Sequence, residues 1–299
     1  MNEIKFIING KRKDDLKLQE AIENIQKKRE IKLDIYFTKG VEGEIFEEIK
    51  KENLKKVVAG GGDGTINQVL NALLKVNPNL ELAILPLGTA NDFATAARIP
   101  FNLEEGINLA LDGESFFVDY VKVNQKYFLN VATGGFGAQI TISTPPALKN
   151  ILGGKAYALT GLLKLFSFVP IEGTLWIDGY EVESSAIAVA VCNARQAGGG
   201  VILAPEACID DGKLDIALFT FKNVEAPAHL QPKTNSILSR FSFRKLFRGS
   251  KVKFKPKNGL KIMNLDGEPF EAEVFEFEII PSKLKLTLPS NSPLLGGRV

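Results

Sequence analysis

The first third of the chain alternates between apolar patterns of period two and apolar patterns of helical period. Consecutive apolar residues mark Ile4 to Asn9, helical spacing runs from Leu16 to Arg29, and alternation of apolar and polar residues follows from Lys32 to Thr38. Apolar residues at every second position are typical of strands, and spacings of three and four are typical of helices. The pattern therefore predicts a strand, a helix and a second strand.

The same alternation continues across a glycine-rich loop. Short strands are predicted at Lys56 to Ala59 and at Leu82 to Leu85, and a helix between them carries apolar residues at helical spacing. Strand, loop, helix and strand in this order are typical of an open, mostly parallel sheet covered by helices. We expect an α/β domain in this part of the chain.

From about Phe117 onward, strand patterns dominate. Val118 to Val123 and Lys126 to Val131 flank the dipeptide Asn124-Gln125, which predicts a β-hairpin. One helical pattern, Ala147 to Phe168, interrupts the later strands. These are expected at Thr174 to Ile177, Glu181 to Ser184, Ala186 to Val191, Leu214 to Phe219, Leu260 to Leu265, Val274 to Ile280 and Leu284 to Leu288.

This change of pattern predicts two domains. Residues 1–118 form an α/β domain, which residues 287–299 complete, and residues 119–286 form a β-rich sandwich domain. Active sites are common in clefts between closely packed domains. We therefore expect both domains to contribute functional residues to one site.

Composition excludes several classes of protein. A net charge of +2 and 45% hydrophobic residues are typical of a compact globular protein that does not bind nucleic acid. Cys192 and Cys208 lack C-x-x-C spacing, which favours a reducing compartment such as the cytoplasm. Neither the first ten residues nor Ala156 to Ile171 has the pattern of a signal peptide or a membrane span. A single histidine, His229, excludes histidine-dependent triads and multi-histidine zinc sites.

Candidate chemistry begins at the run Gly60-Gly61-Gly62-Asp63-Gly64-Thr65, which follows a strand and precedes a helix. Glycines let the backbone approach an anion closely, and the helix directs its positive N-terminus at the loop. Asp63 would repel bare phosphate, which indicates a metal ion or a hydroxyl group between them. The alternative is a tight turn without a ligand, and the run matches neither a P-loop nor a G-x-G-x-x-G motif.

A second polar loop, Leu85 to Phe93, follows the next strand and should lie beside the first loop at the same sheet edge. Thr89 offers a hydroxyl group to a ligand in the shared cleft. Asn91 or Asp92 could cap the helix that follows, and for Asn91 this capping is an equal alternative to a functional role.

Six motifs in this order make the sequence resemble the bacterial diacylglycerol kinase catalytic family, most closely its YegS-like lipid kinases. They are Gly61 to Asn67, Leu85 to Phe93, Ala132 to Gly137, Arg195 to Gly200, Asp210 to Gly212 and Leu265 to Pro269. NAD kinases and phosphofructokinases share the first motif, whereas the ordered set is specific to the lipid kinases. The resemblance implies a nucleotide-binding α/β domain of NAD kinase/phosphofructokinase type and a β-rich domain that binds lipid and supplies catalysis.

The resemblance also implies roles for individual residues. Glu268 matches the family's proton acceptor. The implied magnesium site consists of the Asp211 carboxylate and the backbone carbonyls of Cys208 and Lys213, and oxygen ligands suit Mg²⁺. Asp63, Asp92 and Asp211 are expected to meet in one network of water and metal. The implied nucleotide-binding residues are Thr38, Gly61, Gly62, Asp63, Gly64, Thr65, Ile66, Asn67 and Thr89.

Without the resemblance, simpler interpretations hold for two of these features. Asp211-Gly212 would be an ordinary hairpin turn, and Glu268 an exposed glutamate of a hairpin. Asp210 and Lys213 stand where relatives often carry other residues, a difference that could alter metal affinity.

Two segments are candidates for lipid contact. Residues 240–257 combine eight basic residues with phenylalanines and contain no acidic residue, a mixture that can dock on an anionic membrane. The alternative is a strand edge protected by lysines, with the phenylalanines in the core. The apolar segment Ala156 to Phe168 could contact acyl chains, and core packing is its alternative.

Together these features predict an ATP-dependent lipid kinase that uses Mg²⁺ or another divalent cation. It would transfer the γ-phosphate of ATP to a hydroxyl group of a phosphatidylglycerol-like or diacylglycerol-like lipid, in the cytoplasm or peripherally at the inner face of the membrane. The alternatives are a kinase for a soluble acceptor such as NAD and a non-catalytic nucleotide or lipid sensor.

Overall fold

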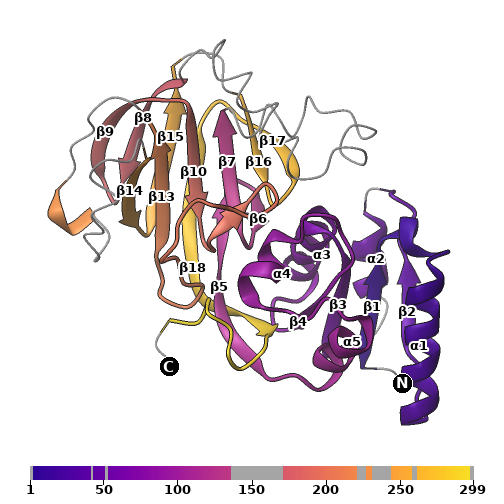
Figure 1. Cartoon of the computed structure of the whole chain (residues 1–299). Helices are drawn as coiled ribbons and strands as arrows, with labels where there is room; N and C mark the ends of the chain where they lie inside the picture. Colours follow the sequence, from indigo (N-terminus) through magenta and orange to yellow (C-terminus); the bar gives the residue numbers. More distant parts are fainter. Residues whose placement is uncertain are drawn as a thin grey trace.

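The structure is a computed structural model of the 299-residue chain and describes residues 3–41, 43–50, 53–135, 171–220, 227–230, 244–257 and 261–296. An α/β half with the N-terminus lies beside a β-rich half (Figure 1). The expected helix at Ala147 to Phe168 lies outside the described residues, as do Phe136 and Gly137 of the third motif.

The α/β half is built on four parallel strands in the order β2-β1-β3-β4. One face packs on helices α2, α3 and α4, and the other packs on α1 and α5. This arrangement confirms the predicted open α/β sheet. The strands are β1 (Ile4–Ile8), β2 (Asp34–Phe37), β3 (Lys56–Gly61) and β4 (Glu81–Pro86), and the helices are η1 (Gly10–Arg12), α1 (Leu16–Arg29), α2 (Glu44–Lys50), α3 (Asp63–Val76), α4 (Asp92–Ala97) and α5 (Leu103–Asp112).

The sheet continues into the β-rich half. Strand β18 (Phe275–Thr287) pairs with β4 in parallel through Lys285 and Leu286 and with its other neighbours in antiparallel orientation. The complete sheet has ten strands. The added strands are β5 (Ser115–Val123), β6 (Lys126–Phe128), β8 (Ile171–Ile177), β9 (Tyr180–Ala186) and β15 (Lys251–Pro256).

A second, antiparallel sheet packs on this extension and completes the predicted sandwich. Its order is β14-β13-β10-β7-β16-β17, and a separate two-stranded hairpin joins β11 to β12. The bounds are β7 (Val131–Gly135), β10 (Ala188–Cys192), β11 (Gln196–Ala197), β12 (Val201–Ile202), β13 (Leu214–Phe219), β14 (Arg244–Gly249), β16 (Ile262–Leu265) and β17 (Glu268–Glu271), with the short helix η2 (Ala228–Leu230) between β13 and β14.

The strand expected at Lys126 to Val131 is instead two strands in different sheets. Strand β6 ends at Phe128 and β7 begins at Val131. Side chains bind the backbone between them: the Asp266 carboxylate accepts the Leu129 and Asn130 N–H groups, and Asn193 Nδ2 donates to the Leu129 carbonyl. The two strands expected at Val274 to Ile280 and Leu284 to Leu288 form one strand, β18, with an irregularity between Ile280 and Leu284.

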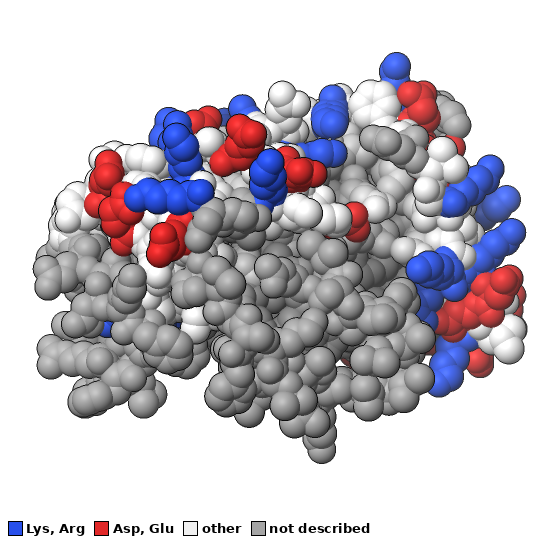
Figure 2. All heavy atoms as spheres, turned by 90° about the horizontal axis from the view of Figure 1, so that it is seen from above, with Lys and Arg blue, Asp and Glu red and all other residues white. Residues whose placement is uncertain are grey.

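In the described part of residues 240–257 the phenylalanines lie in the core, as the second interpretation expected, but β15 pairs on both sides, with β8 and β18, and is not a strand edge. Phe247 and Phe254 are buried, so these two rings are unavailable to a membrane. The intervening lysines of β15 form ion pairs, with Lys251 contacting Glu278 at 2.8 Å and Lys253 contacting Glu276 at 2.9 Å. On the face seen in Figure 2, basic and acidic side chains of this half are interspersed. Within the described residues, no helix combines the length and the apolarity needed to cross a membrane.

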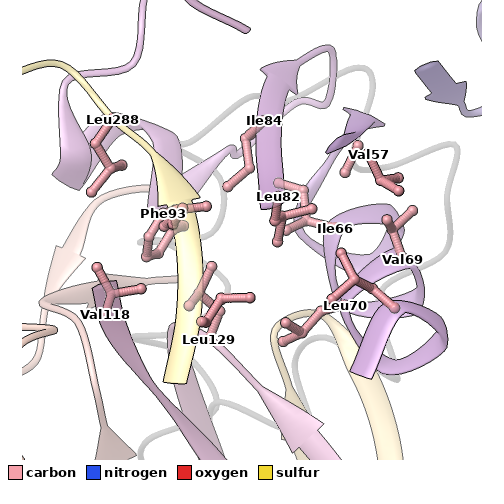
Figure 3. Packing of buried hydrophobic residues seen from close by; sticks show 14 of the residues in the cluster. Val57, Ile66, Val69, Leu70, Leu82, Ile84, Phe93, Val118, Leu129 and Leu288 are labelled. Carbon is pink, nitrogen blue, oxygen red and sulfur yellow. The ribbon is translucent and has the colours of Figure 1, made fainter. Parts of the chain in front are cut away.

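The largest apolar core joins distant parts of the chain. Ile66, Val69 and Leu70 of α3 point toward β3 and β4, and Val118, Leu129 and Leu288 lie in the same cluster (Figure 3). Leu294 and Leu295, close to the C-terminus, also belong to this core. The C-terminal segment therefore stabilises the same core as the N-terminal sheet.

Replacement of Leu294 by Ala should lower the free energy of unfolding by about 2–5 kcal/mol, because it removes fully buried methyl groups. Leu16→Ala is the matched control, since Leu16 is 77% exposed, and should change this free energy by less than about 0.5 kcal/mol. Urea unfolding of both variants measures the difference. Equal, small effects would mean that the C-terminal segment does not contribute to the core.

Candidate functional site

Three loops meet at the carboxyl ends of the parallel strands. Asn9 follows β1, donates its N–H to the Gly60 carbonyl at 2.7 Å and donates through Nδ2 to Thr65 Oγ1 at 2.9 Å. Leu87 follows β4 and donates its N–H to the Gly61 carbonyl at 2.9 Å. The glycine run therefore lies between its two neighbours, at the sheet edge where open α/β sheets bind ligands.

The glycines are required by close backbone contacts. A Cβ atom at Gly88 would overlap Cα of Gly62, and a Cβ atom at Gly61 would lie 2.5 Å from the Thr65 side chain. Gly60 and Gly61 are the last residues of β3, so the loop itself is shorter than the run of glycines. Only the bare backbone fits between the first and second loops, which confirms that they lie side by side.

Asp63 connects the first loop to the second. It is the first residue of α3, and its carboxylate accepts the N–H groups of Asp92 at 3.2 Å and Phe93 at 3.3 Å. Burial, together with the neighbouring charge of Asp92, raises the pKa of Asp63. The start of α4 is therefore capped by Asp63, a residue 29 positions earlier in the chain.

The capping role considered for Asn91 is wrong. Asn91 adopts a left-handed conformation with φ 48° and makes no side-chain bond to α4. Its Oδ1 accepts the Gly88 N–H at 2.8 Å, and its Nδ2 donates to the Gly88 carbonyl at 2.9 Å. Asn91 thus closes the second loop on itself, because both polar atoms of its amide bind the peptide groups of one residue.

Asp92 links α4 to the β-rich half. Its buried carboxylate accepts the N–H groups of Gly199 at 3.0 Å and Gly200 at 2.8 Å, at the tip of the hairpin between β11 and β12. Both glycines have positive φ angles, which turn their N–H groups toward one oxygen pair. The fourth motif, Arg195 to Gly200, therefore contacts the second.

The residues expected to bind nucleotide differ in which of their atoms are exposed at this edge of the sheet. Thr89 is exposed, whereas Thr38 Oγ1 accepts the Gly10 N–H at 3.1 Å. The Ile66 side chain lies in the core. Asn67 is also buried, and its Nδ2 donates to the Tyr127 carbonyl at 3.0 Å. The side chains of Ile66 and Asn67 are thus both engaged inside the protein, and the Ile66 N–H donates to the Gly62 carbonyl at 3.1 Å.

Glu268 reaches the glycine run from the β-rich half. A Cβ atom at Gly64 would overlap Oε1 of Glu268, so the carboxylate occupies the space that the missing side chain leaves. The Gln68 Nε2 group donates to the same oxygen at 3.4 Å. Residues separated by two hundred positions in the chain therefore meet at one point.

Asp266 supports the turn that carries Glu268. Its buried carboxylate accepts the backbone N–H groups of Leu129 at 2.7 Å, Asn130 at 3.0 Å and Val131 at 2.9 Å. Burial raises its pKa to about 6 against the opposing effect of these donors, and the Asp63 charge contributes in the same direction.

The residues of the expected magnesium site lie on the loop that leads into β13. The Asp211 carboxylate pairs with Arg248 and accepts the Lys213 N–H at 3.0 Å, and Arg248 also contacts Asp215. Buried Asp119 accepts the Gly212 N–H at 2.7 Å, and burial raises its pKa. No hydrogen bond or ion pair joins Asp211 to Asp63 or Asp92 among the residues that the structure describes.

Three residues of the site carried no role in the sequence interpretation. Asn9 and Arg12 follow the first strand, and Arg12 donates to the Leu87 carbonyl while it pairs with Asp15 at 3.1 Å. The rule that ligands bind at the carboxyl ends of parallel strands could have indicated this third loop. Asp266 lies in the sixth motif, but no local pattern indicated its role, because its partners lie more than a hundred residues away.

Comparison with known proteins gives matches over nearly the whole chain. Residues 3–123 match the sequence model of the diacylglycerol kinase catalytic domain, and residues 131–288 match that of the YegS C-terminal NAD kinase beta sandwich-like domain. The chain is 36% identical over 301 residues to a "Probable lipid kinase YegS-like" of Shewanella frigidimarina, with 99% of this chain and 96% of the relative covered. It is 38% identical over 295 residues to a "Probable lipid kinase YegS" of Escherichia coli, with 97% of each covered.

The fold is also found in a solved structure. A diacylglycerol kinase from Bacillus anthracis superposes with a TM-score of 0.68 at 22% identity, over 96% of this chain and 97% of that chain. This likeness concerns the arrangement of the strands and helices.

Replacement of Gly64 by Ala should displace the Glu268 carboxylate, because the new Cβ atom would overlap Oε1 at the free end of a flexible side chain. We expect turnover with ATP and lipid to fall on the order of 10²-fold, as small misplacements of reacting groups do. Thermal stability should be retained, since alanine is the better helix former.

Gly106→Ala in α5 is the control, because it makes the same replacement within a helix and its Cβ atom meets Leu85 Cδ1 at 2.9 Å and the Pro100 carbonyl at 3.3 Å, not Glu268. It should leave turnover unchanged. Full turnover in the Gly64 variant would mean that the observed Glu268 position does not matter.

Proposed function

Because this chain belongs to the diacylglycerol kinase catalytic-domain family, we propose that it is an ATP-dependent lipid kinase, which transfers the γ-phosphate of ATP to a lipid hydroxyl group. The observation that carries the proposal is the contact of Glu268 with Gly64. It brings a carboxylate of the β-rich half against a loop suited to phosphate. A single site thereby contains both a phosphate-binding loop and a base.

The nucleotide would bind along the three loops. The backbone N–H groups at the start of α3 and the positive end of that helix suit phosphate oxygens. We assign nucleotide contacts to residues of the first loop, the start of α3 and the two flanking loops: Thr38, Gly61, Gly62, Asp63, Gly64, Thr65, Ile66, Asn67 and Thr89. Arg12 adds a cation at the same edge.

Glu268 would act as the proton acceptor. The lipid hydroxyl gives its proton to the carboxylate while its oxygen bonds to the γ-phosphorus, the bond from that phosphorus to the bridging oxygen breaks, and ADP leaves. In phosphoryl transfer, catalysis comes mainly from positioning and charge stabilisation, and a carboxylate that receives the hydroxyl proton is a recurring component. Glu268 is half-buried, which leaves one side of it open to an acceptor.

The proposed divalent cation would bind at the turn of Asp211. Among the residues that the structure describes, no three acidic, cysteine or histidine side chains are placed to hold a metal ion, so backbone carbonyls would complete its ligands. Asp119, Asp210, Asp211 and Asp215 surround one turn, and the charge of Arg248 balances only part of theirs. Carboxylate and carbonyl oxygens are the ligands that Mg²⁺ prefers. We propose that the Asp211 carboxylate and the carbonyls of Cys208 and Lys213 would hold Mg²⁺, whose positive charge would offset the negative charge of Asp211. Cys208 contributes no thiolate, because burial raises the pKa of its thiol.

The lipid acceptor is favoured over a soluble one because the relatives named as lipid kinases match this chain from end to end. The acceptor would be a phosphatidylglycerol-like or diacylglycerol-like lipid, reached from the cytoplasm. Peripheral membrane contact through residues 240–257 is electrostatic in this proposal, since both described phenylalanines are buried. Radiolabelled ATP with a panel of dispersed lipids, and with NAD as the soluble acceptor, tests the choice.

Glu268→Gln should retain ATP binding and lose turnover by at least about 10²-fold, because glutamine cannot accept the hydroxyl proton. Isothermal titration with ATP and a radiolabel assay with lipid measure the two effects. Glu271→Gln, an exposed position of the same strand, is the control and should behave as wild type. Normal turnover in the Glu268 variant would remove its assigned role.

Magnesium or manganese chloride should raise the melting temperature of the wild-type protein, because an ion that binds only the folded state stabilises it. Asp211→Asn should abolish most of this rise. Asp14→Asn removes the same charge at an exposed position and should keep the full rise. An unchanged rise in the Asp211 variant would show that the ion binds elsewhere.

A further inference from the structure

The turn that carries Glu268 is fixed to the phosphate-binding loop through a third segment, residues 127–131. This segment connects β6 to β7 and crosses from one sheet to the other. Side chains of helix α3 bind the first residue of the segment, Tyr127. The side chain of Asp266 binds its last three residues. The segment is thus bound both to α3, which begins at the glycine run, and to the turn that carries Glu268.

The α3 side of this connection consists of two buried asparagines. Asn71 Nδ2 donates to the Tyr127 carbonyl at 2.8 Å, and the Tyr127 N–H donates to Asn71 Oδ1 at 3.0 Å. Asn67 Nδ2 donates to the same carbonyl at 3.0 Å. The backbone N–H and the backbone carbonyl of Tyr127 are therefore both bound by side chains of α3, the helix that begins at the glycine run.

The Asp266 side consists of one carboxylate and three successive N–H groups. These donors belong to Leu129, Asn130 and Val131, at 2.7 to 3.0 Å. The carboxylate is buried, and a buried carboxylate costs several kcal/mol unless such donors compensate it. Its geometry therefore allows little displacement of the turn relative to the segment.

The turn itself brings Glu268 to Gly64. Asp266 and Gly267 both have positive φ angles, 48° and 97°, and Asn264 Oδ1 accepts the Gly267 N–H at 2.7 Å. A Cβ atom at Gly267 would lie only 3.3 Å from the Gly64 nitrogen. The backbone of Gly267, which stands between Asp266 and Glu268 in the chain, therefore lies directly against Gly64.

We propose that Asp266 is a positioning residue for Glu268: by accepting the N–H groups of residues 129–131, it fixes the Glu268 carboxylate against Gly64 in the phosphate-binding loop. This inference rests on the proposed function of Glu268. Asp266 touches neither substrate, and its effect on the reaction passes through the position of the turn.

A second Asp-Gly turn offers a matched control. Asp178 and Gly179 also have positive φ angles, 48° and 86°, and join two antiparallel strands, β8 and β9. The Asp178 carboxylate likewise accepts backbone N–H groups, from Ser250 at 2.9 Å and Lys251 at 2.8 Å. This turn lies at the end of the ten-stranded sheet away from β3.

Asp266→Asn should lower kcat by about 10- to 100-fold with KM for ATP nearly unchanged, because only the base is displaced. Asp178→Asn should keep wild-type kcat and KM. Asp266→Glu retains the charge but lengthens the side chain, so it should also lower kcat, and it serves if the asparagine variant does not fold. Unchanged kcat in both Asp266 variants, or a parallel loss of ATP affinity, would overturn the proposal.

Hydrogen exchange of the ligand-free proteins separates this proposal from the proposed function. In Asp266→Asn, exchange should accelerate in residues 127–131 and 264–271 and remain unchanged in residues 53–61. Unchanged exchange in 264–271 would overturn the positioning role even if lipid phosphorylation is found. Absence of lipid phosphorylation in the wild type, with accelerated exchange in the variant, would instead overturn only the proposed function.

Discussion

The architecture depends on one strand, β18, which pairs in parallel with β4 at its C-terminal end and in antiparallel orientation with β5 and β15 along its length. Hydrogen bonding on both edges forces the α/β half and the β-rich half into a single sheet. The largest apolar core also joins the two halves, since Leu286 and Leu288 belong to one cluster with residues of α3 and β4. The two halves are therefore fixed relative to each other by backbone pairing and apolar burial. A site assembled from both requires such a frame, because its parts lie hundreds of residues apart.

Within this frame, buried carboxylates set the finer positions. Asp63, Asp92, Asp119 and Asp266 each accept backbone N–H groups from another part of the chain. Removal of a carboxylate from water costs several kcal/mol, and convergent N–H donors offset that cost only in narrow geometries. Apolar packing tolerates small shifts between surfaces, whereas a buried charge surrounded by donors tolerates few. Acidic residues therefore contribute to geometric precision here as well as to the proposed metal and proton chemistry.

Local patterns predicted most of this fold, and long-range contacts explain where they failed. The helix at Leu16 to Arg29 and the strand at Leu214 to Phe219 agree residue by residue, because each has a clear apolar face. The break between β6 and β7 was missed, since it is caused by Asn193 and Asp266, which lie far along the chain. The same reason hid the contact of Glu268 with Gly64. Sequence spacing indicated the meeting of the first two loops, because parallel strands place their ends at one edge.

The contact between Asp92 and the hairpin tip limits which mutations can change it. One partner is a side chain, while the other consists of the backbone N–H groups of Gly199 and Gly200 in left-handed conformations. The contact uses no side chain at the tip. Most replacements of Gly199 or Gly200 would strain the backbone, because residues with a Cβ atom rarely adopt these positive φ angles. A change at position 92 can therefore weaken or remove this contact between the two halves, whereas a new side chain at the tip leaves its N–H groups in place.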